Sequence, residues 1–373
     1  MNIVFDVSDL STNRADGTTR YTYELARRLP KLDPSINWTY AAPFDGANRI
    51  AEVTAGQPSV KTSLTPWPRF WTQLRFPFDL ARAKPDVLLM PIQQLPLLRP
   101  RETKTVAVVH DLAFHYFPQQ FTYKNWALLH LFTAHAVREA DEIIAVSHST
   151  AKDIAHYYGR TNNVHVIHHG VDHTQFRLPS AEEKVATWQT LRQEYSQLQP
   201  EYLLFVGQIQ PRKNLVRLIE AFERLGNDFP NQLVIAGGHG WLQEDIKKRI
   251  QASPIKNRII ELGRVPDELL RALYWNAAAF VLPSLYEGFG MPILEAMASG
   301  CPVVTSNVSS LPEIAGEAAV LINPQNPTSI AAGIKAALDN QLNLRVEGIG
   351  QARKFSWDQT AQQTLAILKA ANQ

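Results

Sequence analysis

Short apolar runs alternate with helix-forming segments along almost the whole chain, and this alternation limits the fold more than any other feature. An apolar run between turn residues is typical of a buried strand, and apolar residues at helical spacing are typical of a helix. Strands are predicted at residues 3–8, 37–42, 87–91, 104–110, 142–147, 164–168, 202–206, 232–236, 258–262, 278–282, 302–306 and 319–322. Such alternation gives parallel sheets covered by helices on both faces. The sequence therefore predicts an α/β protein with two Rossmann-like domains of six strands each, with ligands at the carboxyl ends of the strands.

The length of 373 residues suits two domains, each with its own core. A boundary is expected after Gly170-Val171-Asp172, because a polar helical segment at 179–199 separates this turn from a new buried strand at 202–206. The predicted domains are residues 1–173 and 174–354, followed by a tail at 355–373. In the tail, Trp357, Leu365 and Leu368 have the spacing of the apolar side of an amphipathic helix.

The composition is that of a folded globular protein, with 45% hydrophobic and 19% charged residues. The net charge of +2 gives no overall sign of nucleic-acid binding. A single cysteine, Cys301, excludes an internal disulfide framework and fits a reducing compartment. The N-terminus runs directly into a predicted strand, and no apolar stretch is long enough to span a membrane. We therefore expect a cytoplasmic protein.

The strongest functional signal lies in residues 283–300, PSLYEGFGMPILEAMASG. This stretch follows a predicted buried strand, and Gly288 and Gly290 then form a turn that exposes the backbone. Pro292 suits the start of a helix, which Gly300 ends. A strand, a glycine turn and a helix N-terminus together present N–H groups to an anion, and phosphate is the usual one.

Two carboxylates flank this turn, Glu287 before it and Glu295 one helical turn after it. A carboxylate is a poor phosphate contact, so we expect both to accept hydrogen bonds from hydroxyl groups. A ligand with phosphate between two hydroxylated rings is a nucleotide sugar. The alternative is an ordinary β-α unit with two solvated glutamates.

Glu287 and Glu295, with Gly-Phe-Gly-Met-Pro between them, resemble the E-x7-E element of retaining GT-B glycosyltransferases of family GT4. The resemblance covers nearly the whole chain, with specific motifs in the second half and weaker matches in the first. It implies two Rossmann-like domains facing across a cleft, with the tail 355–373 crossing back onto the first domain. It also implies that Glu287 holds the transferred sugar and Glu295 the ribose of the nucleotide, with retention of anomeric configuration.

Two adjacent cations, Arg212 and Lys213, lie where a helix starts after the strand at 202–206. Positive charge at a helix N-terminus is unfavourable unless an anion also binds there. The guanidinium fork and the ammonium point charge together suit a diphosphate. The alternative is an ordinary basic helix face, but this segment also resembles the R-K pair of the family.

Further donor contacts are expected at other strand ends. Residues expected to contact the donor are Gly17, Gly207, Gly238, Arg264, Val265, Gly288, Phe289, Gly290 and Met291. By resemblance, the backbone at Val265 reads the base edge, and Arg264 stacks on the base or is structural. Gly17 stands alone in the first loop, where the family often has a second glycine, and Thr18-Thr19 follow it. The absence of G-x-G-x-x-G there argues against a nicotinamide dinucleotide site.

His110 ends a predicted strand of the first domain, where ligands gather. A lone histidine at a strand end is commonly structural, but by resemblance His110 lies beside the donor sugar. We therefore expect four catalytic residues, His110, Glu287, Arg212 and Lys213. Asp111 is interpreted as orienting His110 or capping the next turn.

No metal and no cofactor are expected. The four histidines at 165, 168, 169 and 173 have no cysteine or paired carboxylate to complete a metal site. The sequence also lacks Asp-x-Asp, the motif of metal-dependent transferases. The charge on the leaving diphosphate is instead expected to be stabilised by Arg212, Lys213 and the backbone N–H groups of Gly288–Gly290.

The expected reaction is hexose transfer from a nucleotide-diphosphate sugar to a glycan or a lipid-linked glycan. The resemblance to bacterial surface-polysaccharide mannosyltransferases favours GDP-mannose over a UDP-sugar. Two alternatives are a GT-B nucleotide-sugar epimerase, which turns over without acceptor, and a non-catalytic nucleotide-sugar-binding protein. Aromatic and basic residues interleave at 64–80, which indicates either peripheral contact with the inner face of a membrane or a core-packing helix. No nucleic-acid partner is expected.

Overall fold

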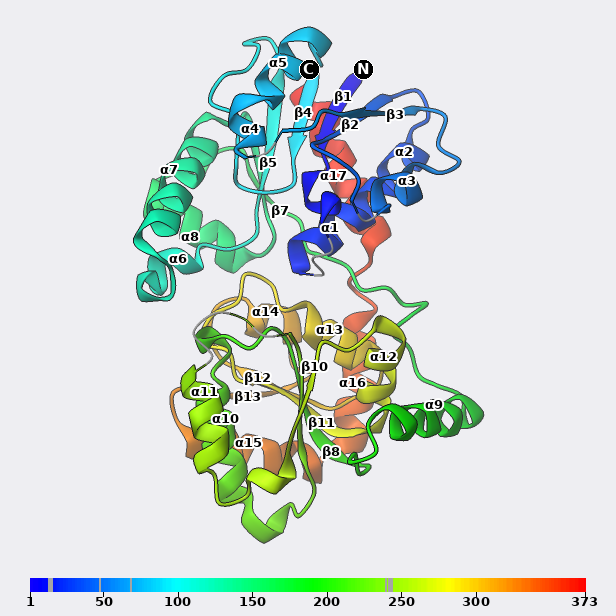
Figure 1. Cartoon of the computed structure of the whole chain (residues 1–373), viewed down its shortest axis with the longest axis vertical. Coiled ribbons are helices and arrows are strands. Elements are labelled where there is room, and N and C mark those ends of the chain that lie inside the picture. The colour runs from blue at the N-terminus through cyan, green and yellow to red at the C-terminus, as the bar shows by residue number, and fades with distance from the viewer. Residues whose placement is uncertain (13–15, 47, 68, 239, 241–243) are drawn as a thin grey trace. The chain divides into compact units, whose positions relative to one another are not determined.

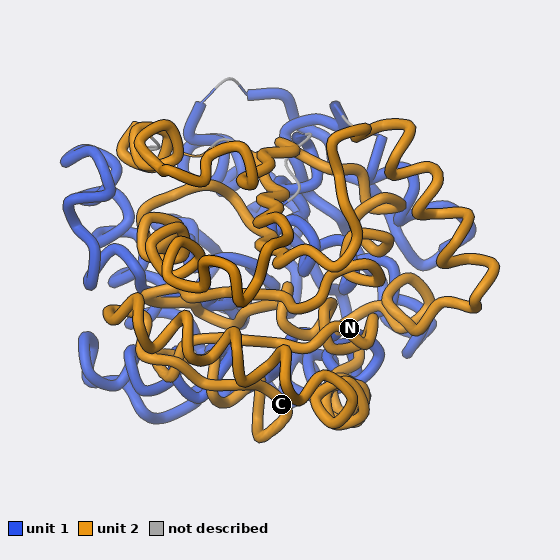
Figure 2. Tube along the Cα trace, turned by 90° about the horizontal axis from the view of Figure 1, so that it is seen from below, with its two compact units in different colours: residues 1–170, 357–373 blue, residues 171–356 orange. Residues whose placement is uncertain are grey.

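The computed structural model describes residues 1–12, 16–46, 48–67, 69–238, 240 and 244–373. The chain divides into two compact units, which Figure 2 shows in different colours. Unit 1 consists of residues 1–170 and 357–373, and unit 2 of residues 171–356. Each unit contains one parallel sheet with helices, so the predicted α/β class with two Rossmann-like domains is confirmed.

Unit 1 is built on a seven-stranded parallel sheet with the order β3-β2-β1-β4-β5-β6-β7. Its strands are β1 (Asn2–Asp6), β2 (Asn37–Ala42), β3 (Val60–Leu64), β4 (Val87–Met90), β5 (Lys104–Val109), β6 (Glu142–Ala145) and β7 (Val164–Val166). The central strands β1, β4, β5 and β6 are apolar and almost completely buried, because helices cover both faces of the sheet.

The helices of unit 1 fill the connections between strands, and α17 returns from the C-terminus (Figure 1). They are α1 (Gly17–Ala26), α2 (Leu29–Leu32), α3 (Arg49–Thr54), α4 (Trp71–Leu74), α5 (Phe76–Ala83), α6 (Ala113–Tyr116), α7 (Tyr123–Glu139), α8 (His148–Tyr158) and α17 (Trp357–Ala371). Helix α17 packs against α1 and β5. Two ion pairs tie α17 to unit 1, Arg28–Asp358 at 2.7 Å and Lys369–Asp33 at 2.6 Å.

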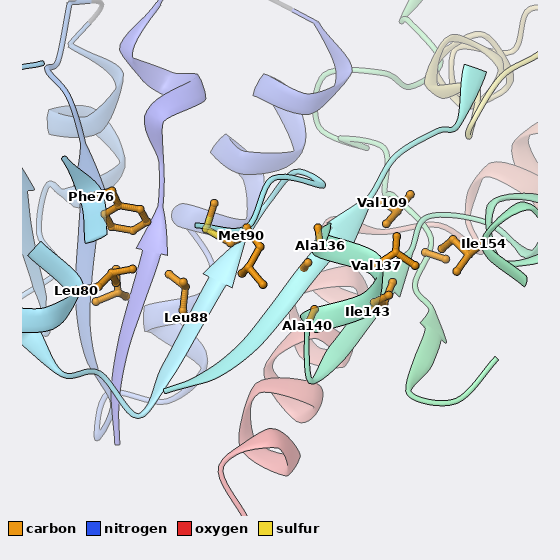
Figure 3. Packing of buried hydrophobic residues seen from close by; sticks show 14 of the residues in the cluster. Phe76, Leu80, Leu88, Met90, Val109, Ala136, Val137, Ala140, Ile143 and Ile154 are labelled. Carbon is orange, nitrogen blue, oxygen red and sulfur yellow. The ribbon is translucent and has the colours of Figure 1, made fainter. Parts of the chain in front are cut away.

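Figure 3 shows part of the core of unit 1. Phe76 and Leu80 of α5 lie on the side of the sheet that carries Leu88 and Met90 of β4. Each of these four side chains has an exposed fraction of 0%. One face of α5 is therefore fixed against the sheet.

Unit 2 contains a six-stranded parallel sheet with the order β10-β9-β8-β11-β12-β13. Its strands are β8 (Tyr202–Val206), β9 (Leu233–Ala236), β10 (Ile259–Gly263), β11 (Ala277–Leu282), β12 (Val303–Ser306) and β13 (Val320–Ile322). Its helices are α9 (Ala181–Glu194), α10 (Leu215–Leu225), α11 (Glu244–Ala252), α12 (Asp267–Asn276), α13 (Met291–Ala298), α14 (Leu311–Ala315), α15 (Pro327–Asp339) and α16 (Gln341–Ala352). The strands β8 and β11 are adjacent at its centre, so the loops that follow them meet at one edge.

The prediction of six strands in the first domain was wrong, because β3 was missed. This strand lies at the edge of the sheet and pairs only with β2. Its central residues, Lys61 and Thr62, are polar and exposed. An edge strand that faces solvent lacks the apolar run by which buried strands are recognised.

Candidate functional site

Three charged side chains meet in unit 2, where β8 and β11 end. The Lys213 Nζ lies 2.5 Å from the Glu287 Oε1, and the Arg212 Nη1 lies 3.1 Å from the Glu287 Oε2. These are the three residues of the second half that the sequence assigned to catalysis, and the tertiary structure brings them together. Glu287 is 6% exposed and Lys213 is 8% exposed, so this ion pair is almost entirely withdrawn from water, whereas the Arg212 side chain is half-buried.

Burial and pairing act in opposite directions on Glu287. Burial alone raises the pKa of the Glu287 carboxyl, because the charged form loses hydration. The positive charges of Lys213 and Arg212, with hydrogen bonds from Lys213 and Ser284, outweigh burial and hold the pKa below its usual value. The carboxylate is therefore ionised, and the cluster of two cations and one anion carries a net positive charge.

The backbone around Arg212 and Lys213 is fixed by the loop that carries Glu287. The Arg212 carbonyl accepts a hydrogen bond from the Leu285 N–H at 2.8 Å. Asn214 follows the cations in the left-handed region, with a φ of 63°, which an asparagine tolerates. Its side-chain amide donates to the carbonyl oxygens of Pro283 at 2.9 Å and Pro324 at 2.7 Å. The two loops are thus one hydrogen-bonded unit.

Three serines that the sequence analysis did not identify hold Glu287 in place. The Ser284 hydroxyl donates to the Glu287 Oε1 at 2.7 Å, and the Glu287 N–H donates to the Ser309 Oγ at 3.0 Å. The Ser310 hydroxyl lies 2.9 Å from the carbonyl oxygens of both Glu287 and Phe289. Ser309 and Ser310 are more than 20 residues from Glu287 along the chain, so no local pattern predicts these contacts.

Glycine turns bring the loops after β8 and β9 into direct contact. A Cβ atom at Gly237 would lie 1.8 Å from the Gly207 carbonyl oxygen, and one at Gly240 would lie 2.4 Å from the Ile209 carbonyl oxygen. The Ile209 N–H donates to the Gly238 carbonyl at 3.0 Å, which joins the loops further. Only glycine allows so close an approach of two backbones. The predicted donor residues Gly207 and Gly238 are thus adjacent; His239 and Trp241 lie outside the described residues.

Helix α13 begins immediately after the glycine turn that the sequence indicated. Gly290 precedes it with a φ of 107°, and Met291 is the first helical residue, one position before Pro292. Glu295 lies one turn inside α13 and accepts a hydrogen bond from the Tyr274 hydroxyl at 3.0 Å. Burial raises the pKa of Tyr274 well above its usual value, so this phenol stays protonated and donates to Glu295. The sequence gave no sign of Tyr274 as a partner of Glu295, because the contact joins two helices.

The remaining predicted donor residues differ in their surroundings. Phe289 is 4% exposed and its ring lies 6.1 Å from that of Phe355, so its side chain is part of the packing of unit 2. After β10, Arg264 is exposed and Val265 is half-buried. Gly263 has a φ of 67° and its carbonyl accepts from the Gly237 N–H at 2.7 Å, which places the end of β10 beside the loop after β9.

The other two predicted site residues, His110 and Gly17, belong to unit 1. His110 is 8% exposed, and its Nε2 lies 2.7 Å from the Pro91 carbonyl oxygen. Its ring contacts those of Tyr21 at 5.0 Å and His169 at 5.3 Å between centroids. Burial lowers the pKa of His110, so the imidazole is neutral. Gly17 is the first residue of α1, and the loop residues 13–15 before it lie outside the described part of the chain.

Within the described residues, no group of three or more His, Cys, Asp or Glu side chains is arranged to hold a metal ion. His165 instead lies 2.7 Å from the Glu142 carboxylate, and His173 contacts the Phe355 carbonyl. No helix in the described ranges has both the length and the apolar character needed to cross a membrane.

Two family models match the chain, and each covers most of one unit. Residues 15–175 match the glycosyltransferase family 4 model, and residues 187–355 match that of the glycosyl transferases group 1. The second range contains the whole Arg212, Lys213 and Glu287 cluster. The chain belongs to the GT4 family of glycosyltransferases. The GT4 protein described here thus carries both halves of the family pattern in the expected order.

Among curated proteins, this GT4 chain is similar to O-antigen chain mannosyltransferase B of Escherichia coli. They are 38% identical over 184 residues, which is 48% of each chain. It is also similar to the serotype-specific mannosyltransferase WbdA of E. coli, with 30% identity over 267 residues, which covers 69% of this chain and 32% of WbdA. The alignments therefore span about half of the first relative and a third of the second.

Solved structures confirm the fold over the full length. The structure of Anabaena Alr3699/HepE in complex with UDP-glucose has a TM-score of 0.76 and 18% identity, and covers 99% of this chain and 100% of that one. Sucrose-phosphate synthase from Thermosynechococcus elongatus has a TM-score of 0.75 and 19% identity, with coverage of 99% and 98%. At these identities the likeness establishes the fold alone.

Proposed function

We propose that this GT4 protein transfers a hexose, with mannose preferred, from a nucleotide-diphosphate sugar to a glycan or a lipid-linked glycan. The observation that carries the proposal is the cluster of Arg212 with the buried residues Lys213 and Glu287 at the ends of β8 and β11. Ligands of parallel α/β sheets bind at this edge. Both E. coli relatives are named as mannosyltransferases, which supports mannose as the sugar.

In this proposal the cluster stabilises the leaving nucleoside diphosphate without a metal ion. Negative charge grows on the leaving phosphate as the sugar departs, and pre-oriented positive groups lower the energy of that state. Arg212 and Lys213 are held in place by Glu287 and by the hydrogen bond to Leu285, so their charges need little rearrangement when the donor binds. The N–H groups at the start of α13 add to the same field.

The two glutamates divide the rest of the donor between them. We assign the hydroxyl groups of the transferred sugar to Glu287 and the ribose hydroxyl groups to Glu295. Tyr274 supports this role of Glu295, since its hydroxyl donates to one carboxylate oxygen at 3.0 Å and so fixes the orientation of the side chain. We further propose a same-face reaction through an oxocarbenium-like state, with retention of anomeric configuration, in which His110 holds a sugar hydroxyl group. Glu287 is not assigned as a nucleophile.

A donor screen followed by a transfer assay tests the proposal. Binding of the correct donor stabilises the folded protein by mass action, so the unfolding temperature is measured with GDP-mannose, GDP-glucose, UDP-glucose and no ligand. GDP-mannose is expected to give the largest increase. The stabilising donor is then incubated with and without mannose-terminated oligosaccharides. Transfer to an oligosaccharide supports the proposal, whereas epimerised donor without acceptor, or binding with no turnover, would overturn it.

We also propose that the enzyme is cytoplasmic and lies peripherally at the inner face of the membrane. Its single cysteine, Cys301, is buried and unpaired, which suits a reducing compartment. Burial raises the pKa of this thiol to about 12, so it stays protonated and unreactive. The part of the surface that makes the membrane contact is argued next.

A further inference from the structure

Exposed apolar side chains gather in one short segment of unit 1. Among the described residues, 17 large hydrophobic side chains are exposed, and seven of them lie between Leu64 and Leu98, in less than a tenth of the chain. Leu98 is 73% exposed and Phe78 is 69% exposed. Single exposed apolar residues need no explanation, but a contiguous group of them marks an interaction surface.

Helices α4 and α5 present part of this group as one stripe. Phe70 immediately precedes α4, Leu74 is the last residue of α4 and Phe78 lies in the first turn of α5, so these exposed side chains follow one another along the two helices. The opposite face is anchored, since Trp71 and Phe76 are buried and stack at 4.5 Å between ring centroids. Figure 3 shows Phe76 pointing into the core, so the stripe faces away from it. The core-packing interpretation of residues 64–80 thus holds for one face only.

The loop after β4 extends the stripe. The Gln73 side chain donates to the Leu95 carbonyl at 3.2 Å and accepts from the Leu97 N–H at 3.0 Å. These two bonds fasten the loop to α4 and hold Leu97 and Leu98 exposed beside it. We name the whole group the α4–α5 surface; it consists of Trp67, Phe70, Leu74, Phe78, Leu97 and Leu98.

The charge of this segment decides the kind of partner. Residues 64–101 contain six basic and two acidic side chains, a net charge of +4, whereas the whole chain has +2. The rest of the chain therefore carries −2, and all excess positive charge lies in this segment. Arg75 pairs with Asp79 at 2.8 Å, but Arg69 and Arg82 are exposed and form no ion pair with any described residue. Exposed apolar side chains with unpaired arginines around them match an anionic lipid surface.

We propose that the α4–α5 surface docks on a membrane rich in anionic lipid. The aromatic and leucine side chains enter the boundary between headgroups and acyl chains, and Arg69 and Arg82 lie among the lipid phosphates. Only the role of this docking rests on the proposed function, because docking would bring a lipid-linked acceptor within reach of the enzyme. Docking itself needs neither donor nor acceptor.

The test is co-sedimentation of the full-length protein with lipid vesicles, in the absence of nucleotide sugar. Vesicles of phosphatidylcholine alone are compared with vesicles that also contain phosphatidylglycerol. The wild-type protein is expected to bind the anionic vesicles and to be released by salt. Leu74→Gln/Phe78→Gln is expected to lower the bound fraction roughly tenfold. Arg69→Gln/Arg82→Gln is expected to lower it to a similar extent, on anionic vesicles only.

The matched control is Leu342→Gln/Val346→Gln on α16 of unit 2, an exposed apolar pair with the same spacing, 78% and 71% exposed. It is expected to bind vesicles as the wild type does. Equal binding of wild type to both vesicle types, or an equal loss in the control, would overturn the proposal. Sedimentation velocity measures whether the protein dimerises, and so tests whether a second copy of the chain, and not a membrane, covers the α4–α5 surface. A dimer that Leu74→Gln/Phe78→Gln abolishes would also overturn it.

A donor-binding measurement on the same proteins separates this proposal from the proposed function. The altered side chains lie in unit 1 and are exposed, so donor binding and the unfolding temperature should stay at the wild-type level in every variant. If no nucleotide sugar binds while vesicle binding behaves as expected, only the proposed function fails. If donor binding is normal and the vesicles leave the protein in solution, the membrane surface and the peripheral location fail, and the proposed transfer reaction is unaffected.

Discussion

The two units use buried polar groups at their strand ends in opposite ways. In unit 2, burial of Glu287 is compensated by two cations, so the site keeps its charges in a region withdrawn from water. In unit 1, His110 and His169 are packed among aromatic rings, and burial lowers the pKa of both, so neither is charged near neutral pH. A low-dielectric site that keeps its charges suits an ionic ligand, which favours unit 2 as the donor site of the proposed function.

The difference also indicates what each unit contributes to recognition. A charged cluster braced by serines and by the backbone holds its positive groups in fixed positions, which suits the diphosphate of the proposed function. A neutral imidazole has one donor and one acceptor nitrogen and no charge, and here its Nε2 already contacts the Pro91 carbonyl. We therefore expect the donor diphosphate to depend on unit 2, with His110 adding orientation of the sugar.

The largest effect is expected for Lys213→Ala. Removing one cation from a desolvated phosphate site should raise the transition-state free energy by about 2–4 kcal/mol, which lowers kcat/KM roughly a hundredfold or more. The control is Lys335→Ala, which removes a lysine of unit 2 whose ion pair with Asp228 is exposed, with 59% and 64% of the two side chains accessible. That variant should be near normal in kcat/KM. Near-normal kinetics for Lys213→Ala would mean that the buried charges of unit 2 serve only stability.

The next effect concerns the backbone contact that supports those charges. In Gly237→Ala, the new Cβ would lie 1.8 Å from the Gly207 carbonyl oxygen, so the loop after β8 must move. We expect a loss of about 1–3 kcal/mol in the free energy of unfolding. Gly238→Ala is the matched control, because no atom of the described residues, apart from its chain neighbours, lies within 4 Å of its added Cβ. Urea unfolding of both variants measures the difference, and an equal effect in the two would contradict the close approach of the loops.

A pair of isosteric variants separates the roles of the two glutamates. Glu295→Gln should weaken binding of the free nucleoside diphosphate and of the whole donor, because both contain the ribose. Glu287→Gln should leave the affinity for the free nucleoside diphosphate nearly unchanged and lower kcat, since hydroxyl contacts strengthen as the sugar ring flattens.

The measurements for this pair are calorimetric binding of nucleoside diphosphate and of donor, with transfer rates. The expected reductions are on the order of tenfold to a hundredfold. If Glu287→Gln weakened the bare diphosphate as much as Glu295→Gln, sugar and ribose could not be divided between the two carboxylates. Glu287 would then act mainly through Arg212 and Lys213, with which it is paired.

A smaller effect tests the neutral histidines of unit 1. Burial, with the nearby His130 and His156, lowers the pKa of His115 from 6.5 to about 4. The unfolded chain therefore binds a proton that the folded chain does not, between pH 6.5 and about pH 4. This contribution to stability is fully present above pH 6.5 and is lost as the pH falls towards 4. His115→Phe should reduce the pH dependence of the unfolding temperature in that window. An unchanged pH dependence would show that His115 is not neutral in the folded protein.

The smallest expected effect is that of a chelator. Arg212, Lys213 and the N-terminus of α13 supply the positive field in unit 2, so transfer should be the same with and without excess EDTA. Loss of transfer with EDTA and its recovery with Mg²⁺ or Mn²⁺ would count against the phosphate site described for unit 2. The control is a metal-dependent transferase, which must lose activity under the same conditions.

The sequence by itself determined the α/β class, nearly all of the strands and the central motif. These features are local: a buried strand is a continuous apolar run, and a glycine turn before a helix is visible within ten residues. The edge strand β3 was not predicted from the sequence, because two of its central residues, Lys61 and Thr62, are polar and exposed. The adjacent cations Arg212 and Lys213 are also visible locally, since their position before a helix is unfavourable without an anion.

Only the tertiary structure decided what holds the central motif in place. Glu287 meets Lys213 across 74 residues of chain, and its N–H meets Ser309 across 22. Tyr274 reaches Glu295 from a different helix, and Gly237 touches Gly207 from a neighbouring strand end. The order of strands in the sheet sets each of these contacts, and a strand order is fixed by packing of the whole core. The spacing of residues along the chain therefore indicated the groups of the candidate site, and the folding of β8 beside β9 and β11 gave them their partners.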